Sequence, residues 1–329
     1  MMLREGKLPP AVLERLVRYT SSAPEILVGA AVGEDAAVVR GFDTLVITSD
    51  PITFTEEEIG TYVVSVNAND IVAMGGSPRY LTTTILAPVG TEEERLERVF
   101  ARLEAACRRL GLLWVGGHTE VSSAVNRIVV CGHAVGVLER EATGSDRGRP
   151  GDALVLTKWA GLEGTTLIAR ERPRECSDLL GPQRYADVLK WLEEPGISIV
   201  PEGRLTARCA ISAAHDPTEG GVATGIREIA QRSGLGVVVN LEAVQIREET
   251  RVVCRRYGMD PLGLLSSGCF LFGAAPPEAA RAAAMLNSSG IDAAVIGTLT
   301  QDQELLIQDA GARRPLPSFE RDECLKAIG

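Results

Sequence analysis

The chain has 329 residues, of which 45% are hydrophobic, and a formal net charge of −10. This length exceeds one typical hydrophobic core and predicts two domains, and the apolar content excludes a disordered chain. The negative charge, without any cluster of Lys and Arg, argues against nucleic-acid binding. Since no stretch has the length of a membrane span or the pattern of a signal peptide, we expect a cytoplasmic protein.

The cysteines and histidines restrict the kind of metal site. There are seven cysteines, an odd number that is scattered along the chain without a CxxC pair, so we expect reduced thiols. With only three histidines, a zinc site has no support. Any bound metal should therefore be a hard cation with oxygen ligands.

The first half of the chain alternates helical and β-rich segments. Apolar spacing predicts helices over 9–20, 59–74 and 92–111. β-branched and alternating runs predict strands over 38–40, 44–50, 80–89, 112–117 and 126–138, the first two as a hairpin. The pattern indicates an α/β domain over 1–149.

A stretch rich in Gly, Pro and charge at 144–152 precedes a new apolar run, which places the domain boundary near Pro150. The second domain, 150–329, repeats the alternation. Its predicted helices follow the turn at 161–166 and cover 220–234 and 276–290, and its strands cover 153–157, 236–240, 268–274 and 293–299. This half is also predicted to be α/β.

Carboxylate and amide side chains recur where strands meet loops or helices. The set comprises Glu34, Asp35, Asp50, Asn67, Asn69, Asp70 and Asp216. Mg²⁺ takes one or two carboxylates and completes its shell with phosphate oxygens and water. Any single position could equally cap a helix or make a turn. Asp50 ends a strand before Pro51, which does not suit a helix cap. The polar residues at 67–70 interrupt an apolar helix, where short polar side chains are unfavourable. Both observations favour a functional site over a capping role.

The sequence HDPTEGG at 215–221 opens a helix. Asp216 or Thr218 can serve as the N-cap, and Gly220 and Gly221 let backbone N–H groups approach an anion at the positive helix end. Glycine is also favoured where elements pack tightly, so these two glycines are explained either by phosphate binding or by close packing. A second glycine-rich turn at 161–166 has the same ambiguity and lacks the Lys of a Walker A loop.

Seven strings in this order are specific together: VGEDAAVV, TSD, VNANDIVAMGGSPRY, GGHTEV, PGDALVLT, HDPTEGGVATGIREIA and GMDPLGLLSSG. They resemble the superfamily of aminoimidazole ribonucleotide synthetase (PurM-like), which includes thiamine-monophosphate kinase and selenophosphate synthetase. The resemblance is closest to its HypE-related members, which act in hydrogenase maturation as carbamoyl dehydratases.

The resemblance implies an N-terminal PurM-like α/β domain that forms a dimeric β-barrel, and a C-terminal ferredoxin-like α/β domain. It implies a homodimer that holds ATP and Mg²⁺ between the domains. ATP would phosphorylate an oxygen of a small-molecule, peptide or carbamoyl acceptor, with a maturation partner protein involved. The alternative is a non-catalytic ATP-binding maturation factor or sensor, which would bind nucleotide without turnover.

Site residues follow from the resemblance. It implies Mg²⁺ ligands at Asp35, Asp50 and Asp70, and nucleotide contacts at these positions and at Asn67, Asn69, Thr218, Gly220 and Gly221. His118 stands where many relatives have Asp in a GGDT string, so it would bind phosphate or act as a base while Glu120 joins the metal, unless it only ends a strand. Catalytic roles are thus expected for His118, Asp216 and His215.

Three further expectations concern other residues. His133 lies in an apolar strand and is expected to be a core or barrel residue. The carbamoyl dehydratases carry their substrate on a terminal Cys, whereas Cys324 lies in a short amphipathic segment, 320–328, and is expected to be packed. Residues 171–206, rich in charge and Pro, are a candidate substrate lid.

Overall fold

The computed structural model describes residues 6–7, 10–28, 38–39, 44–53, 55–138 and 141–328. Asp35, one of the predicted metal ligands, lies outside these residues, as does Glu34. Tertiary contacts divide the chain into two compact units. Unit 1 is Met1–Val72 with Gly76–Glu139, and unit 2 is Ala73–Gly75 with Arg140–Gly329.

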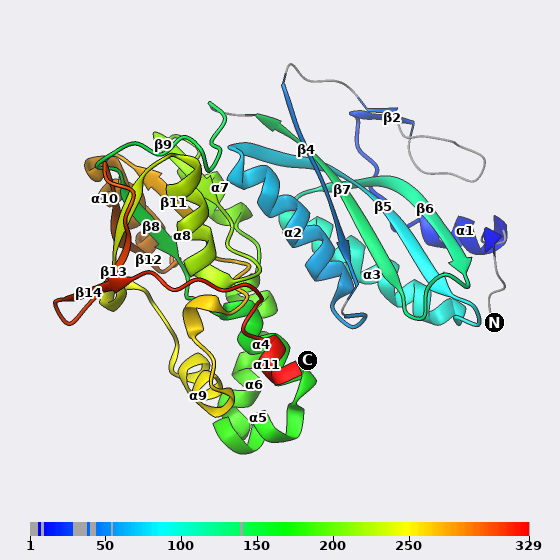
Figure 1. The fold of residues 1–329 in the computed structure, drawn as a ribbon. Coiled ribbons are helices and arrows are strands. Elements are labelled where there is room, and N and C mark those ends of the chain that lie inside the picture. The colour runs from blue at the N-terminus through cyan, green and yellow to red at the C-terminus, as the bar shows by residue number, and fades with distance from the viewer. Residues whose placement is uncertain are drawn as a thin grey trace. The chain divides into compact units, whose positions relative to one another are not determined.

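Unit 1 is a five-stranded sheet with order β1-β6-β5-β7-β4, and α2 and α3 lie along one side of it (Figure 1). Its elements are β1 (Gly6–Lys7), α1 (Pro10–Val17), β2 (Ile26–Val28), β3 (Val38–Val39), β4 (Leu45–Ile52), α2 (Ile59–Ala73), β5 (Gly76–Pro88), α3 (Glu93–Leu110), β6 (Leu113–Ser122) and β7 (Val129–Leu138). The predicted helices at 59–74 and 92–111 are confirmed to within a residue or two.

The two helices are positioned by simple features of their sequences. In α3 the apolar residues Leu96, Val99 and Leu103 fall on one face and are buried, and the helix ends at Gly111, which adopts the left-handed conformation. A Cβ on Gly60 would lie 2.5 Å from a backbone carbon of Arg102. Glycine at position 60 therefore allows α2 and α3 to pack backbone against backbone.

The predicted hairpin between 38–40 and 44–50 is wrong. β3 pairs with β2, whereas β4 pairs with β7 along its whole length, from Leu45 opposite Val137 to Ile52 opposite Val130. An eight-residue strand gains a full ladder of hydrogen bonds on β7, which a two-residue partner cannot offer. Among the described residues the sheet is open, with β1 and β4 as its outer strands, so the dimeric barrel stays a prediction.

Unit 2 is built on a seven-stranded sheet with order β14-β13-β10-β12-β8-β11-β9, antiparallel except for the β10–β13 pair. Its strands are β8 (Ala153–Thr157), β9 (Ile211–His215), β10 (Gly236–Asn240), β11 (Leu271–Ala274), β12 (Ala293–Thr300), β13 (Leu305–Asp309) and β14 (Ala312–Pro315). Its α-helices are α4 (Leu162–Glu171), α5 (Pro173–Leu180), α6 (Pro182–Lys190), α7 (Val200–Thr206), α8 (Gly221–Arg232), α9 (Glu248–Tyr257), α10 (Pro276–Ser288) and α11 (Leu325–Ile328).

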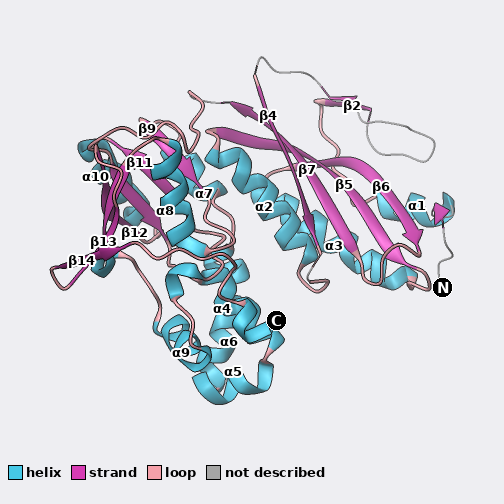
Figure 2. Ribbon diagram, viewed as in Figure 1, coloured by secondary structure: helices cyan, strands magenta, loops and turns pink. Residues whose placement is uncertain are grey.

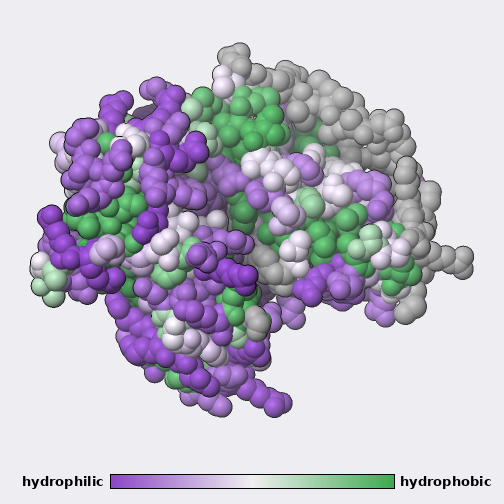
Figure 3. Space-filling view, viewed as in Figure 1, coloured by the Kyte–Doolittle hydropathy of each residue, from purple (hydrophilic) through white to green (hydrophobic). Residues whose placement is uncertain are grey.

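Two apolar cores organise unit 2. One lies between the sheet and α8 and includes Leu154, Ile226 and Leu271. The other belongs to a group of helices, α4, α5, α6 and α9, that stands apart from the sheet in Figure 2. The candidate lid, 171–206, contains α5, α6 and α7, and its role as a lid stays a prediction. The visible surface of unit 2 is mainly hydrophilic (Figure 3).

The mixed α/β class predicted from the sequence is confirmed by these two units. Within the described residues, no helix is both long enough and apolar enough to cross a membrane. All seven cysteines are free thiols, and six of them are buried.

Candidate functional site

The backbone of Asp50 is anchored to α2 by Asn67. The Asp50 N–H donates to Asn67 Oδ1 at 3.0 Å, and Asn67 Nδ2 donates to the carbonyls of Val63 at 2.8 Å and Asp50 at 3.4 Å. Asn67 is fully buried, so these bonds replace the water that its amide loses on folding. Asn67 thus positions Asp50, and its amide is already engaged with backbone groups.

A second polar contact lies one turn further along α2. The Thr48 hydroxyl donates to Asp70 Oδ2 at 2.6 Å, a short bond typical of a charged acceptor. Thr48 and Asp50 alternate with outward-facing residues on β4, so both point toward α2. Asp50 and Asp70 are both partly exposed, while Asn69 is fully buried. The predicted pair of carboxylates therefore lies on one side of the sheet.

His118 and Glu120 lie on the opposite side of that sheet. A row of paired residues crosses the sheet from β4 to β6. Asp50 pairs with Gly132 on β7, Gly132 pairs with Thr83 on β5, and Thr83 pairs with Gly117 on β6. Directly paired residues share a face, so all four lie on the face toward α2. The next residue, His118, points to the other face, and its Nε2 lies 3.3 Å from Glu120 Oε2. Within one chain the structure does not bring these two side chains together with Asp50 and Asp70.

His133 is on the same face as His118. It lies opposite Ser49 on one side and Thr82 on the other, in the middle of the sheet, and is partly buried. His133 is thus part of the sheet and is not among the buried core residues, and its place in a barrel stays a prediction. Among the residues that the structure describes, no three His, Cys, Asp or Glu side chains group closely enough to hold a metal ion.

The chemistry of Asp50 and Asp70 fits Mg²⁺. Two carboxylates, with the Thr48 hydroxyl beside them, supply only hard oxygen ligands. Mg²⁺ commonly binds through one or two carboxylates and completes its octahedron with phosphate and water. A group of three protein ligands is therefore not required for this ion.

The glycine-rich turn in unit 2 connects β9 to α8. Gly220 is the N-cap of α8 with φ 75°, and Gly221 follows with φ 63°. A Cβ on Gly221 would lie 2.5 Å from the carbonyl oxygen of Leu262, so close packing requires glycine there. The Gly220 N–H donates to Asp322 Oδ2 at 2.9 Å, and Gly221 donates to Thr218 O at 3.0 Å. Both amides of the predicted phosphate site are thus already bonded.

His215, the last residue of β9, forms an ion pair that the sequence did not predict. Its Nε2 lies 2.5 Å from Glu228 Oε2 on α8, and its Nδ1 lies 4.0 Å from Asp216 Oδ1. Burial lowers the pKa of His215, but the hydrogen bond to Glu228 and the charges of Asp216 and Glu228 outweigh it, so the pKa is raised. Protonated His215 is therefore favoured beside Asp216, which is itself buried.

Glu163, in the first turn of α4, is a buried carboxyl that sequence reasoning missed. It is 3% exposed, it accepts hydrogen bonds from the hydroxyl and the N–H of Ser267, and its Oε2 has no partner. Burial raises the pKa of Glu163 to about 7, and the nearby charges of Asp322 and Glu219 add to this effect. Its only sequence signal was a charged residue between apolar and glycine neighbours.

Asp322 and Cys324 belong to the same cluster. Asp322 Oδ1 accepts the N–H of Cys324 at 2.8 Å, and the Cys324 thiol is hydrogen bonded to Asp322. Burial raises the pKa of Cys324, and the Asp322 bond and charge raise it further. The expectation that Cys324 is packed is confirmed, since it is 3% exposed.

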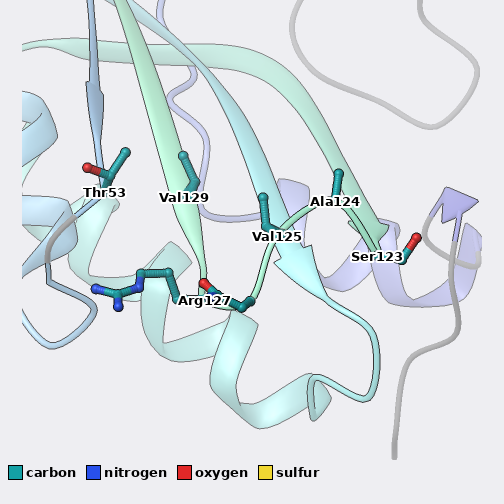
Figure 4. A pocket seen from close by; sticks show the side chains of 7 residues that line it. Thr53, Ser123, Ala124, Val125, Arg127 and Val129 are labelled. Atoms are coloured by element: carbon teal, nitrogen blue, oxygen red, sulfur yellow. The ribbon is translucent and has the colours of Figure 1, made fainter.

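A surface hollow of about 410 Å³ lies elsewhere, at the turn between β6 and β7. It is lined by Thr53, Ser123, Ala124, Val125, Asn126, Arg127 and Val129. In Figure 4 the labelled side chains are spread over the turn between β6 and β7, the start of β7 and the residue that follows β4. It contains none of the predicted site residues.

Comparison with known proteins identifies the class. The N-terminal domain of AIR synthase related proteins matches residues 33–138, and the C-terminal domain of the same proteins matches residues 149–309. The chain therefore belongs to the AIR synthase related family, as the sequence motifs predicted.

The relatives of this chain include proteins of hydrogenase maturation. It is 31% identical over 262 residues to the carbamoyl dehydratase HypE of Rhodobacter capsulatus, with 78% of this chain and 73% of the relative covered. It is 25% identical over 290 residues to a putative hydrogenase expression/formation protein of Methanocaldococcus jannaschii, with 85% and 84% covered. The crystal structure of hydrogenase maturation protein HypE in complex with ATP has 26% sequence identity and a TM-score of 0.77, with 94% of each chain covered. The predicted likeness to HypE-related proteins is confirmed.

Proposed function

We propose that this chain is an ATP-dependent enzyme of the HypE type that acts in hydrogenase maturation. In this proposal ATP phosphorylates the oxygen of a carbamoyl or other amide-type acceptor, so that the oxygen can leave and the group is dehydrated. The observation that carries the proposal is the anchored pair Asp50 and Asp70 on the α2 side of the sheet, in a chain whose relatives include HypE bound to ATP.

The residues of this pair have distinct roles in the proposal. Asp50 and Asp70 would hold Mg²⁺, and the ion would supply positive charge to neutralise the transferred phosphoryl group. Thr48 holds the Asp70 carboxylate and Asn67 fixes the backbone of Asp50 before any ligand arrives, which lowers the entropy lost on binding. Asp35 is proposed as a further ligand on the family resemblance alone.

The turn at 215–221 is proposed as a phosphate-binding element, in which Thr218 and the N–H groups of Gly220 and Gly221 would exchange their present hydrogen-bond partners for phosphate. The N-terminus of the 12-residue helix α8 supplies the positive end of a helix dipole there. Asp216 and His215 are proposed to act on the acceptor, since protonated His215 could donate a proton to a leaving oxygen.

A non-catalytic ATP-binding factor is the second candidate. It is favoured by the position of His118 and Glu120 on the far face of the sheet from Asp50. It is also favoured by Cys324, which is buried with a raised pKa and therefore unsuited to carry a substrate in this conformation.

We also propose that unit 1 forms a homodimer through the open face of its sheet. Leu45 and Ile47 on this face are 45% and 69% exposed. A second copy covering this face would bury them and could close the predicted barrel. The maturation partner protein and the cytoplasmic location stay predictions.

The first experiment is calorimetric titration of the full chain with Mg-ATP, followed by measurement of the ADP formed. Asp50 is anchored through its backbone, so Asp50→Ala removes the carboxylate and leaves the bonds to Asn67 in place. We expect micromolar binding to the wild type and at least a tenfold loss in this variant. Asp178→Ala, which removes an exposed carboxylate on α5, is the matched control and should bind like the wild type.

The outcomes separate the two candidates. Binding with ADP formation that rises when a carbamoyl acceptor is added supports the enzyme. Binding without turnover supports the non-catalytic factor. No binding to the wild type at millimolar Mg-ATP would refute both.

A further inference from the structure

The imidazole ring of His215 is held on one side by helix α8. Its Nε2 lies 2.5 Å from Glu228 Oε2, and an ionised carboxylate only accepts, so Nε2 carries the proton of this contact. A Cβ on Gly225, one turn before Glu228, would lie 3.1 Å from His215 Cδ2. Glycine at position 225 therefore lets the edge of the ring pack against the backbone of α8 while Nε2 reaches Glu228.

The charges around this contact favour the ionised pair. Glu228 on α8 and Asp216 in the turn are the charged groups that act on His215, and together they raise its pKa against the opposing effect of burial. The pKa of Glu228 is lowered, first by its hydrogen bond to His215 and then by the charges of His215 and Arg232. Both changes favour an imidazolium beside a carboxylate.

The second ring nitrogen, Nδ1, is not held in the same way. It lies 4.0 Å from Asp216 Oδ1, which is longer than a hydrogen bond. Both nitrogens of an imidazolium carry protons, and the one on Nε2 is engaged by Glu228. The side chain of His215 is 26% exposed, so a ligand oxygen can approach the ring. Nδ1 is therefore the atom from which His215 can give a proton to a ligand.

We infer that Glu228 is a positioning residue, which holds the Nε2–H of His215 so that the Nδ1–H beside Asp216 is the proton donated to the acceptor. This inference rests on the proposed function, in which His215 donates a proton to a leaving oxygen. It adds the atom that donates and the residue that selects this atom.

The proton transfer leaves the contact with Glu228 intact. The Nδ1–H bond breaks, an O–H bond forms on the leaving oxygen, and the electron pair of the broken bond stays on Nδ1. The ring becomes neutral, keeps its Nε2–H on Glu228, and takes its next proton from solvent. The partner of one ring nitrogen thus decides the state of the other, as the carboxylate does in a Ser-His-Asp triad.

The first test measures the protonation of each nitrogen of His215 by NMR of the full chain with isotopically labelled histidine. His215→Gln identifies its signals among the three histidines. Above the folded pKa of His215, we expect the wild type to keep its proton on Nε2. Glu228→Ala should show a measurable share of the form with the proton on Nδ1, and a lower pKa, because the acceptor is gone.

Glu242→Gln is the control for this test, since it removes an exposed carboxylate elsewhere in unit 2 and should titrate as the wild type does. An identical distribution of the proton in Glu228→Ala and in the wild type would overturn the inference.

The second test distinguishes positioning from a structural role by steady-state ADP formation across pH, with Mg-ATP and a carbamoyl acceptor. Glu228→Ala should lower kcat roughly tenfold or more, while the KM for Mg-ATP stays within about twofold, because the ring loses its orientation and the nucleotide contacts remain. Glu228→Gln keeps an oxygen that accepts from Nε2–H but lacks the charge. It should retain kcat to within about threefold at acid pH and lose activity at a lower pH than the wild type on the alkaline side.

The two hypotheses fail separately. If the wild type forms no ADP, the proposed function is refuted, and the NMR test still decides whether Glu228 selects the nitrogen that carries the proton. If the wild type turns over and Glu228→Ala matches it in kcat and in pH profile, the positioning role is refuted while the proposed function stands.

Discussion

Replacement of Glu163 by Gln should stabilise unit 2 at alkaline pH and not at acid pH. The Glu163 pKa rises from 4.5 to about 7 in the folded chain because burial opposes its charge. A carboxyl with a raised pKa binds its proton more tightly when folded. The ionised form therefore destabilises the folded state progressively as pH rises from 4.5 through about 7, and the effect is complete above that value.

The size of the effect follows from the same two values. Each pH unit between them corresponds to about 1.4 kcal/mol, so the neutral side chain of Glu163→Gln should gain about 3 kcal/mol at about pH 8. Well below pH 4.5, where Glu163 is protonated in both the folded and the unfolded state, the variant and the wild type should be equally stable to within about 1 kcal/mol. The amide would also be able to donate to the neighbouring carboxylates of Asp322 or Glu219.

The assay is urea unfolding of both proteins across this pH range, followed by the fluorescence of Trp159 and Trp191 in unit 2, with the contribution of Trp114 in unit 1 common to both proteins. Glu171→Gln, at an exposed position on the same helix, should leave the pH dependence unchanged. A gain that is the same at acid and alkaline pH, or no gain at all, would refute the reasoning about Glu163.

Two ion pairs of unit 2 give the remaining predictions. Lys158 and Glu202 are both at most 4% exposed, and their charged atoms lie 2.9 Å apart. Lys158→Met leaves the Glu202 charge buried without its partner, so it should destabilise unit 2 by about 3–5 kcal/mol in chemical denaturation. Adding Glu202→Met removes that charge and should recover most of the lost stability. A loss in the single variant no larger than that of the double variant would contradict this. Glu228→Gln should lower the pKa of His215 in an NMR titration of the three histidines, since its hydrogen bond and charge hold that pKa up. The matching loss of stability should be present at acid pH and vanish as pH rises through the folded pKa of His215, so an unchanged titration curve would count against the pair.

The sequence by itself determined the elements whose signals are local. The amphipathic period of α3 and its terminal Gly111 depend only on neighbours three or four residues apart, and the helix lies where that pattern predicts it. The family motifs determined the class of protein in the same way, because each motif is a short stretch of consecutive residues that can be recognised without the fold. The polar residues inside the apolar pattern of α2 likewise predicted specific contacts for Asn67 and Asp70, and both side chains hydrogen bond to β4.

Only the tertiary structure decided which strands pair and which side chains meet. The hairpin between 38–40 and 44–50 was wrong because pairing with β7 is a contact between residues far apart in the chain. The pairing register of β6 on β5 places the His118 side chain on the face away from Asp50, and a register shifted by one residue would place it on the same face. Glu163 and Asp322 are separated by most of unit 2 in sequence, and neither has a local pattern that indicates the other. A buried charge cluster arises from the packing of distant segments, so its chemistry follows from the fold and cannot be predicted from local sequence.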